Sequence, residues 1–329
     1  MLRLAWLPFP TRNTPSPTLI ELINVKPATL TLLFALLFAM LSPLHAGDTP
    51  LTAARKGFTT QLLRLDKADL EPDTPPPWEL SLTSYEGPLG KMAAYVSPKP
   101  KDGKRHPAVI WLTGGFSNSI SAIAWTPGPT SNDQSASGFR EAGIVMMYPS
   151  LRGGNQNPGS IETFLGEVDD VIAAARHLAS LDYVDPTRIY LGGHSTGGTL
   201  ALLVAASTNQ FRAIFSLGPV DDILGYGSDV LPFDTTKPKE AQLRSPLRWM
   251  PDITSRTFVF EGEGRQGNID ELRKMSAANR NPRVSFHPIK GGSHFSIIHP
   301  LVRQISQQIL EDKGELVGME FKPREGKPQ

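Results

Sequence analysis

From residue 107 onward, short uninterrupted apolar runs alternate with longer segments that have one apolar face. Strands buried on both faces produce such runs, and strand–helix alternation is typical of a mostly parallel sheet with helices on both faces. We therefore predict an α/β fold. The expected strands are residues 108–112, 144–148, 189–191, 213–217, 257–260 and 284–287. The expected helices are residues 161–181, 196–208, 268–279 and 297–312.

The pattern is different upstream of residue 107. Residues 78–85 and 91–96 are strand-like and flank Glu86-Gly87-Pro88-Leu89-Gly90. This arrangement predicts an N-terminal antiparallel hairpin at the edge of the sheet. Residues 47–77, which end in three prolines, are expected to be a mobile or loosely packed lead-in segment.

One interior segment, residues 218–250, lies between two expected strands and has no strong periodicity. A segment of this length inside a compact domain is often a lid or binding element, and a simple surface excursion is the other interpretation. We expect residues 218–250 and 116–138 to shape the binding pocket. The folded domain is expected to span residues 78–315, followed by a C-terminal tail at 316–329.

An apolar run also lies near the N-terminus, from Ala28 to Leu41. It is shorter than the roughly 20 residues that cross a bilayer. Lys26 precedes it and Ser42-Pro43-Leu44-His45-Ala46 follows it, as in a secretory signal cleaved after Ala46. Residues 1–46 are predicted to be a signal peptide, with an uncleaved membrane anchor as the alternative. We expect an exported protein, periplasmic or secreted, that contacts a membrane only through this segment if it stays uncleaved.

Charge and composition exclude several kinds of partner and site. The 329 residues carry a formal net charge of +1 and no block of like charge, so no nucleic-acid partner is expected. The chain has no cysteine, which excludes disulfides, thiolate zinc sites and a cysteine nucleophile. The motifs imply no metal and no organic cofactor.

The strongest chemical signal is Gly193-His194-Ser195-Thr196-Gly197-Gly198, which separates a strand-like run from a helix-like run. In this setting Gly-x-Ser-x-Gly is a nucleophile elbow, whose strained backbone exposes the serine hydroxyl at the N-terminus of a helix. Side chains two positions before and after the serine would collide with the neighbouring strand and helix, so both positions are glycine. Ser195 is therefore the candidate nucleophile.

A nucleophilic serine needs a base within hydrogen-bond reach. His294 lies in Gly291-Gly292-Ser293-His294-Phe295, a glycine loop between the last expected strand and the last expected helix. From this loop an imidazole can reach the serine. His299 lies one turn into the following helix, and His194 belongs to the elbow itself. We predict that His294 is the base.

An acid that orients the imidazole is expected in the loop after the strand at 257–260, since the order nucleophile, acid, histidine is that of the α/β-hydrolases. Glu263 is close to the strand end and flanked by glycines, and it is the predicted acid. Asp270 is the alternative, although it could instead cap a helix. Asp221 and Asp222, which follow the preceding strand, are a third option.

The oxyanion of the tetrahedral intermediate needs two backbone N–H donors. One is expected from Thr196, directly after the nucleophile. The other is expected from the turn Thr113-Gly114-Gly115-Phe116, which follows the strand at 108–112 and places Gly115 or Phe116 as donor.

From about residue 107 to 308 the chain resembles the α/β-hydrolase superfamily, and more narrowly the catalytic domain of prolyl-oligopeptidase-type serine peptidases and related esterases. The resemblance rests on the elbow and on the segments 112–115, 148–154, 166–170, 184–189 and 292–295. The chain departs from the family at Thr113, where histidine is common, and at Arg265, where the family's aspartate is expected. The stretch between the expected signal and the sheet is too short for the propeller domain of true oligopeptidases.

These motifs predict a serine hydrolase that cleaves an ester or a peptide bond through an acyl-enzyme. The resemblance implies a small-molecule ester or a short peptide as substrate. Because Arg265 stands where the family's aspartate is expected, the alternative function is that of a binding protein that has this fold but no catalytic activity.

Overall fold

The computed structural model describes residues 49–264, 266–314 and 318–321. The predicted signal or anchor at residues 1–46 lies outside the described residues, as do Arg265 and most of the expected C-terminal tail. Within the described ranges, no helix is long and apolar enough to cross a membrane.

The described part of the chain forms one sheet of eight strands in the order β1-β2-β4-β3-β5-β6-β7-β8. β1 and β2 form the predicted antiparallel hairpin, β2 also pairs antiparallel with β4, and every pair from β4 to β8 is parallel. The strands are β1 Ser81–Gly87, β2 Gly90–Val96, β3 His106–Leu112, β4 Val145–Pro149, β5 Val184–His194, β6 Ala213–Leu217, β7 Arg256–Gly262 and β8 Val284–Ile289.

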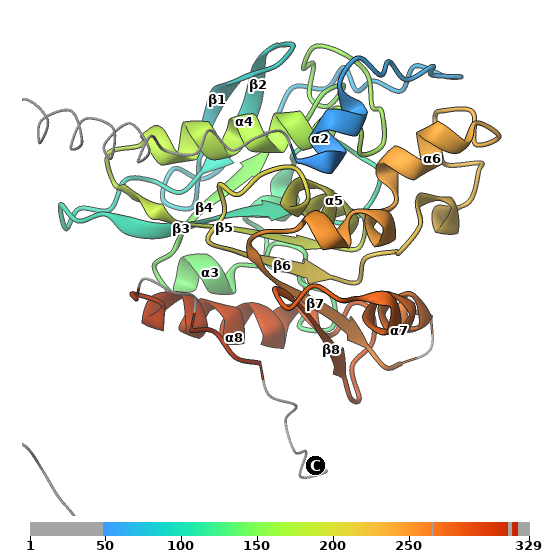
Figure 1. Ribbon diagram of the computed structural model, residues 1–329. Helices are drawn as coiled ribbons and strands as arrows, with labels where there is room; N and C mark the ends of the chain where they lie inside the picture. The colour runs from blue at the N-terminus through green and yellow to red at the C-terminus, as the bar shows by residue number, and fades with distance from the viewer. Residues whose placement is uncertain (1–48, 265, 315–317, 322–329) are drawn as a thin grey trace, which may run out of the picture. The chain divides into compact units, whose positions relative to one another are not determined.

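Helices cover both faces of this sheet, which confirms the predicted α/β fold. α4, α5 and α7 bury side chains in the apolar core on one face, and α3 and α8 do so on the other; Figure 1 shows α4 above the sheet and α3 and α8 below it. The α-helices are α2 Pro50–Arg55, α3 Gly138–Glu141, α4 Glu167–Ser180, α5 Thr196–Ala205, α6 Pro238–Arg244, α7 Ile269–Ala278 and α8 Ile298–Glu311. The 3₁₀ helices are η1 Ala122–Ala124, η2 Ile223–Tyr226, η3 Pro246–Arg248 and η4 Met250–Asp252.

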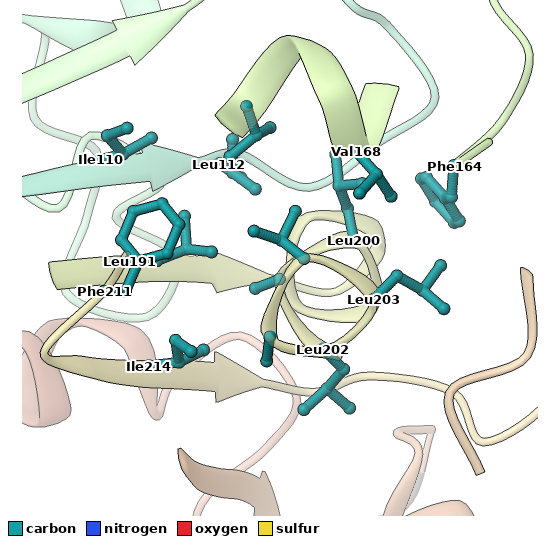
Figure 2. Close-up of a cluster of buried hydrophobic side chains, with 14 of the residues drawn as sticks. Ile110, Leu112, Phe164, Val168, Leu191, Leu200, Leu202, Leu203, Phe211 and Ile214 are labelled. Carbon is teal, nitrogen blue, oxygen red and sulfur yellow. The ribbon is translucent and has the colours of Figure 1, made fainter. Parts of the chain in front are cut away.

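The core beneath the elbow is built from the central strands and α5 (Figure 2). Ile110 of β3, Leu191 of β5 and Ile214 of β6 are buried on this face, together with Leu200 and Leu203 of α5. Burial of one such side chain stabilises the fold by about 1.5–3 kcal/mol. The helix that starts at the elbow is therefore held rigidly against the strands that end beside it.

The helix predicted at residues 161–181 begins later, at Glu167. Thr163 and Phe164 have φ values of 51° and 72°, which a helix does not allow. Residues 162–164 form a turn that Glu167 stabilises. Its Oε1 accepts the backbone N–H groups of Glu162 at 2.7 Å and Thr163 at 3.1 Å. A turn held by a side chain of the following helix has no periodic signature in the sequence.

The strand order reverses around β3. From β3 the chain crosses to β4 on one side and then returns to β5 on the other side. In open α/β sheets, ligands bind outside the carboxyl ends of the strands at such a switch point. The elbow follows β5, and the turn at residues 113–116 follows β3, so both lie at this point of the sheet edge.

The described part of the lead-in segment is largely exposed, but backbone hydrogen bonds join it to the domain. The N–H of Leu63 donates to Pro232 O and that of Ala68 to Gly153 O, both at 2.7 Å. Asp66 O accepts the N–H of Ile161 at 2.9 Å. These bonds use backbone groups of largely exposed residues, and a hydrophobic pattern does not reveal them.

Residues 218–250 form η2, α6, η3 and η4 rather than an irregular loop. Phe233 and Leu243 are buried, and the guanidinium of Arg244 donates to Glu240 Oε2 and, at 2.9 Å, to Thr60 Oγ1 of the lead-in. The segment is thus packed against the domain and against the lead-in. Its action as a lid stays a prediction.

Candidate active site

Ser195 has the strained backbone of a nucleophile elbow, with φ 55° and ψ −116° between β5 and α5. Its N–H donates to Leu217 O at 2.7 Å, which ties the elbow to the end of β6. A Cβ on Gly193 would lie 2.4 Å from the carbonyl oxygen of Gly197, and one on Gly197 would lie 2.2 Å from that of Leu112. Both glycines are therefore required by close backbone approach, as the sequence predicted.

His294 lies in the loop between β8 and α8 and is almost fully buried. Its Nδ1 lies 2.8 Å from Oε2 of Glu261, the last residue but one of β7. The ring packs on the backbone at Gly218, where an added Cβ would lie 2.5 Å from His294 Cε1. Ser195 is bonded to Leu217 and His294 packs on Gly218, so the backbone at the end of β6 contacts both residues.

Glu261 is fully buried and held by the backbone. Its Oε1 accepts the N–H of Gly262 at 2.6 Å, and its Oε2 accepts the N–H of Asn268 at 3.0 Å as well as the histidine. An ionised carboxylate at Nδ1 keeps the proton on that nitrogen and leaves the lone pair on Nε2, which is the tautomer that a general base needs.

The acid predicted from the sequence, Glu263, does not lie beside His294. Its carboxylate is 38% exposed and lies 3.9 Å from the guanidinium of Arg273. The alternative, Asp270, is 90% exposed and also faces Arg273. The position is filled by Glu261, the first residue after the strand expected at 257–260; it belongs to β7, and its side chain reaches the imidazole from there.

The third option for the acid, Asp221 and Asp222, also lies elsewhere. Asp221 binds Lys274 Nζ at 2.6 Å. Asp222 caps η2, where its Oδ1 accepts the N–H of Leu224 at 3.0 Å. The signal that could have found Glu261 is a carboxylate within an otherwise apolar strand, since a fully buried charge needs a partner.

The predicted oxyanion donors lie around the turn after β3. Gly115 has a φ of +100°, and its carbonyl oxygen accepts Thr196 Oγ1 at 2.6 Å. The N–H of Gly114 donates to Gln134 Oε1 at 3.3 Å. Among the residues that the structure describes, no acceptor faces the N–H groups of Gly115, Phe116 or Thr196. Thr196 N at the start of α5 and the two donors of the turn after β3 are suited to bind an oxyanion.

His194 connects the oxyanion turn to the base loop, a role that no local sequence pattern predicts. Gln134 Nε2 donates to His194 Nδ1 at 3.0 Å, and His194 Nε2 donates to the backbone oxygen of His294 at 2.9 Å. Gln134 also accepts from Gly114. Burial, and next the neighbouring His294, lower the pKa of His194 to about 4. His194 is therefore a neutral, buried connector and not a second base.

The depressed pKa of His194 predicts an acid-sensitive contribution to stability. An unfolded histidine has a pKa of about 6.5. Between about 6.5 and 4 the unfolded state binds the proton and the folded state does not, so the free energy of unfolding falls as pH falls through this range. The full effect is about 3 kcal/mol. Urea denaturation of wild type and His194→Gln at pH 7, 5.5 and 4 measures it. Equal acid losses in both proteins would contradict the assignment.

The fold, the elbow and the His294–Glu261 pair define the class: an α/β-hydrolase fold with a serine, histidine and carboxylate arrangement. A family model described as "Prolyl oligopeptidase family" matches residues 130–257, which include Ser195. The resemblance predicted from the motifs is thereby confirmed.

Curated relatives and solved structures agree with this class. The chain is 28% identical over 201 residues to the "Dual function macrocyclase-peptidase POPB" of Galerina marginata, covering 56% of this chain and 26% of that protein. It is 39% identical over 91 residues to the "Probable dipeptidyl-aminopeptidase B" of Metarhizium robertsii, covering 26% and 10%. The chain thus spans about a quarter or less of the length of these relatives. A Mycobacterium tuberculosis puromycin-hydrolyzing peptidase shares the fold, with a TM-score of 0.58 and 22% identity over 74% of this chain and 40% of the other.

Proposed function

We propose that the protein is a serine hydrolase that cleaves ester or amide bonds through an acyl-enzyme. The observation that carries this proposal is the buried bond between His294 Nδ1 and Glu261 Oε2, at the sheet edge where the strained Ser195 lies. A histidine oriented by a carboxylate, together with a serine at a nucleophile elbow, is the arrangement that generates a serine nucleophile.

The geometry assigns a role to each group. Ser195 Oγ forms a bond to the substrate carbonyl carbon, and His294 Nε2 takes the hydroxyl proton. The carbonyl electrons move to oxygen, which receives hydrogen bonds from Thr196 N and from the N–H of Gly115 or Phe116. The carbonyl re-forms, the bond to the leaving group breaks, and His294 gives its proton to that group. Water then attacks the acyl-enzyme with His294 as base, which releases the acid and restores Ser195.

Short peptides are the favoured substrates among the two classes considered. The two curated relatives described above are named as peptidases, and this supports an amide bond as the natural target. The alternative of a non-catalytic binding protein was motivated by Arg265, which stands where an aspartate was expected. Glu261 supplies the carboxylate from another position, so the missing aspartate is no longer a reason to prefer a binding protein without turnover.

Fluorophosphonate labelling of the folded protein tests the proposal. We expect one phosphonyl adduct, and tryptic mass spectrometry should place it on Ser195, because a hydroxyl without a base reacts slowly with this reagent. Ser293 and Ser296 of the base loop serve as internal controls, since their hydroxyls pair with each other at 3.1 Å. Heat-denatured protein should not be labelled. No adduct, or an adduct on another serine, would contradict the proposal.

A further inference from the structure

Gln134 lies in the chain between β3 and β4, within the segment 116–138 that was expected to shape the binding pocket. Its backbone oxygen accepts Trp111 Nε1 of β3 at 3.1 Å, which holds this part of the chain against the sheet. Gln134 also lines a cavity of about 300 Å³, together with Gly115 of the oxyanion turn and Thr196 of α5. The residue is therefore a neighbour of the proposed oxyanion donors.

The side-chain amide of Gln134 joins separate parts of the candidate site. Its Oε1 accepts the N–H of Gly114 at 3.3 Å. Its Nε2 lies 3.0 Å from His194 Nδ1 and 2.9 Å from Asn132 Oδ1. His194 Nε2 in turn lies 2.9 Å from the backbone oxygen of His294. A chain of three hydrogen bonds thus connects the turn after β3, the residue before the nucleophile and the backbone of the base.

The direction of these three bonds is fixed at both ends of the chain. A backbone N–H can only donate, so the amide of Gln134 must present Oε1 to Gly114 and its NH₂ group to His194. The backbone oxygen of His294 can only accept, so the proton of the His194 ring must be on Nε2. Both ends require the same neutral tautomer of His194, and bonds aligned in this way strengthen one another.

Gly114 is the point at which the oxyanion turn meets the elbow. A Cβ added to Gly114 would lie 3.1 Å from His194 Nδ1 and 3.3 Å from Ser195 Cβ. The peptide that follows Gly114 carries the N–H of Gly115, which is one of the proposed oxyanion donors. A misplacement of about 1 Å in a group that acts on the reacting atoms can lower the rate by about 10²-fold. The bond that holds Gly114 N therefore bears on catalysis.

We propose that Gln134 is a positioning residue of the candidate active site: it holds Gly114, and with it the N–H of Gly115, in place beside the nucleophile. The inference rests on the proposed function. Gln134 does not itself donate to the oxyanion, because both N–H groups of its amide are already used by Asn132 and His194. Its effect is exerted where the oxyanion exists, in the transition state, and not in the binding of substrate.

Gln134→Met tests this role, since methionine keeps the length of the side chain and removes its acceptor and its donors. We expect kcat for p-nitrophenyl 4-methylpentanoate to fall about 10²-fold, the size of the loss of one oxyanion donor. KM should stay within about two-fold of wild type, because an interaction made only in the transition state lowers kcat and kcat/KM equally.

Gln156→Met is the matched control for this variant. It makes the same chemical change at an exposed site, where the amide Nε2 of Gln156 donates to the backbone oxygen of Asp69 at 2.8 Å. Its kcat and KM should both stay within about two-fold of wild type, because surface changes away from special features have small effects.

Gln134→Glu tests the direction of the bonds. The carboxylate can still accept the N–H of Gly114, but it cannot donate to His194 Nδ1 unless one extra proton is bound between the two side chains. We expect kcat to be about ten-fold higher than for Gln134→Met, since the acceptor that holds the oxyanion turn is retained. Imidazole ¹⁵N NMR should show the Nδ1 resonance of His194 moved toward that of a protonated nitrogen. In the wild type the same spectrum should show a proton on Nε2 alone.

The outcomes separate the positioning role from the proposed function. No fluorophosphonate adduct on Ser195 of the wild type, together with no ester hydrolysis, overturns the function and the role with it. If Ser195 is labelled but the ester is not hydrolysed, the rate of labelling replaces kcat, because the phosphonyl oxygen meets the same donors.

Three results overturn the role alone while Ser195 is labelled. The first is a kcat of Gln134→Met close to that of wild type, or a loss that lies in KM. The second is an equal loss of kcat for Gln134→Met and Gln134→Glu. The third is a wild-type His194 that carries its proton on Nδ1, and this measurement decides the question even if Gln134→Met does not fold.

Discussion

Replacing Ser195 by alanine should lower kcat about 10⁶-fold, the cost of removing the nucleophile from a serine–histidine–carboxylate site. The remaining activity should come from the oxyanion donors and substrate binding, which alone retain about 10³–10⁴-fold acceleration over water. The fold should persist, because alanine fits the space of serine and the Ser195 side chain makes no capping hydrogen bond at the start of α5. Steady-state hydrolysis of p-nitrophenyl 4-methylpentanoate, with circular dichroism as the folding check, measures the loss.

Ser207→Ala is the matched control for this experiment. Ser207 follows α5, the helix that Ser195 precedes, and its hydroxyl donates to Leu203 O at 2.8 Å. Its loss should leave kcat within about two-fold, because surface changes away from special features are worth about 0.5 kcal/mol. Turnover by Ser195→Ala at more than a hundredth of the wild-type rate would refute the assignment of the nucleophile.

Replacing Glu261 by glutamine should lower kcat about 10⁴-fold with a much smaller change in KM. The amide can donate to Nδ1 of His294, which stabilises the tautomer that carries its proton on Nε2 and cannot accept one from Ser195. The backbone N–H groups of Gly262 and Asn268 also lose a charged acceptor, so a lower thermal unfolding temperature is expected as well. Kinetics must be measured well below that temperature.

Glu263→Gln separates this assignment from the one made on sequence grounds. Glu263 is two residues away and half exposed, and its only described charged neighbour is Arg273 at 3.9 Å. We expect its kcat to stay within about two-fold of wild type, since exposed ion pairs contribute at most about 1 kcal/mol. A large loss for Glu263→Gln with near-normal rates for Glu261→Gln would reverse the assignment.

The sequence was sufficient to predict the fold and two members of the candidate triad. Buried strands produce apolar runs, and the order of nucleophile before histidine follows from the chain itself. The elbow was also predictable, because a side chain at position 193 or 197 would collide with neighbouring backbone, and both positions are therefore glycine. The helix start at Glu167 and the packing of the lead-in were not predicted, because side-chain caps and backbone bonds between distant segments leave no periodic pattern.

The carboxylate that pairs with His294 is the part of the candidate site that the sequence did not predict correctly. Glu261 and Glu263 lie two positions apart in one stretch of chain, and both carry a carboxylate. Their roles differ because β7 directs Glu261 into the space beneath His294 and leaves Glu263 facing solvent. That difference depends on which residues belong to the strand, on the register of β7 against β8, and on the reach of a glutamate side chain.

The sequence by itself determined the α/β architecture, the strained serine turn and the histidine loop, since each depends on burial or on sterics within a few residues. The tertiary structure alone decided that Glu261 holds His294, and that His194 and Gln134 connect the oxyanion turn to the base. These features depend on distances between side chains from strands and loops far apart in the chain, which no local pattern encodes.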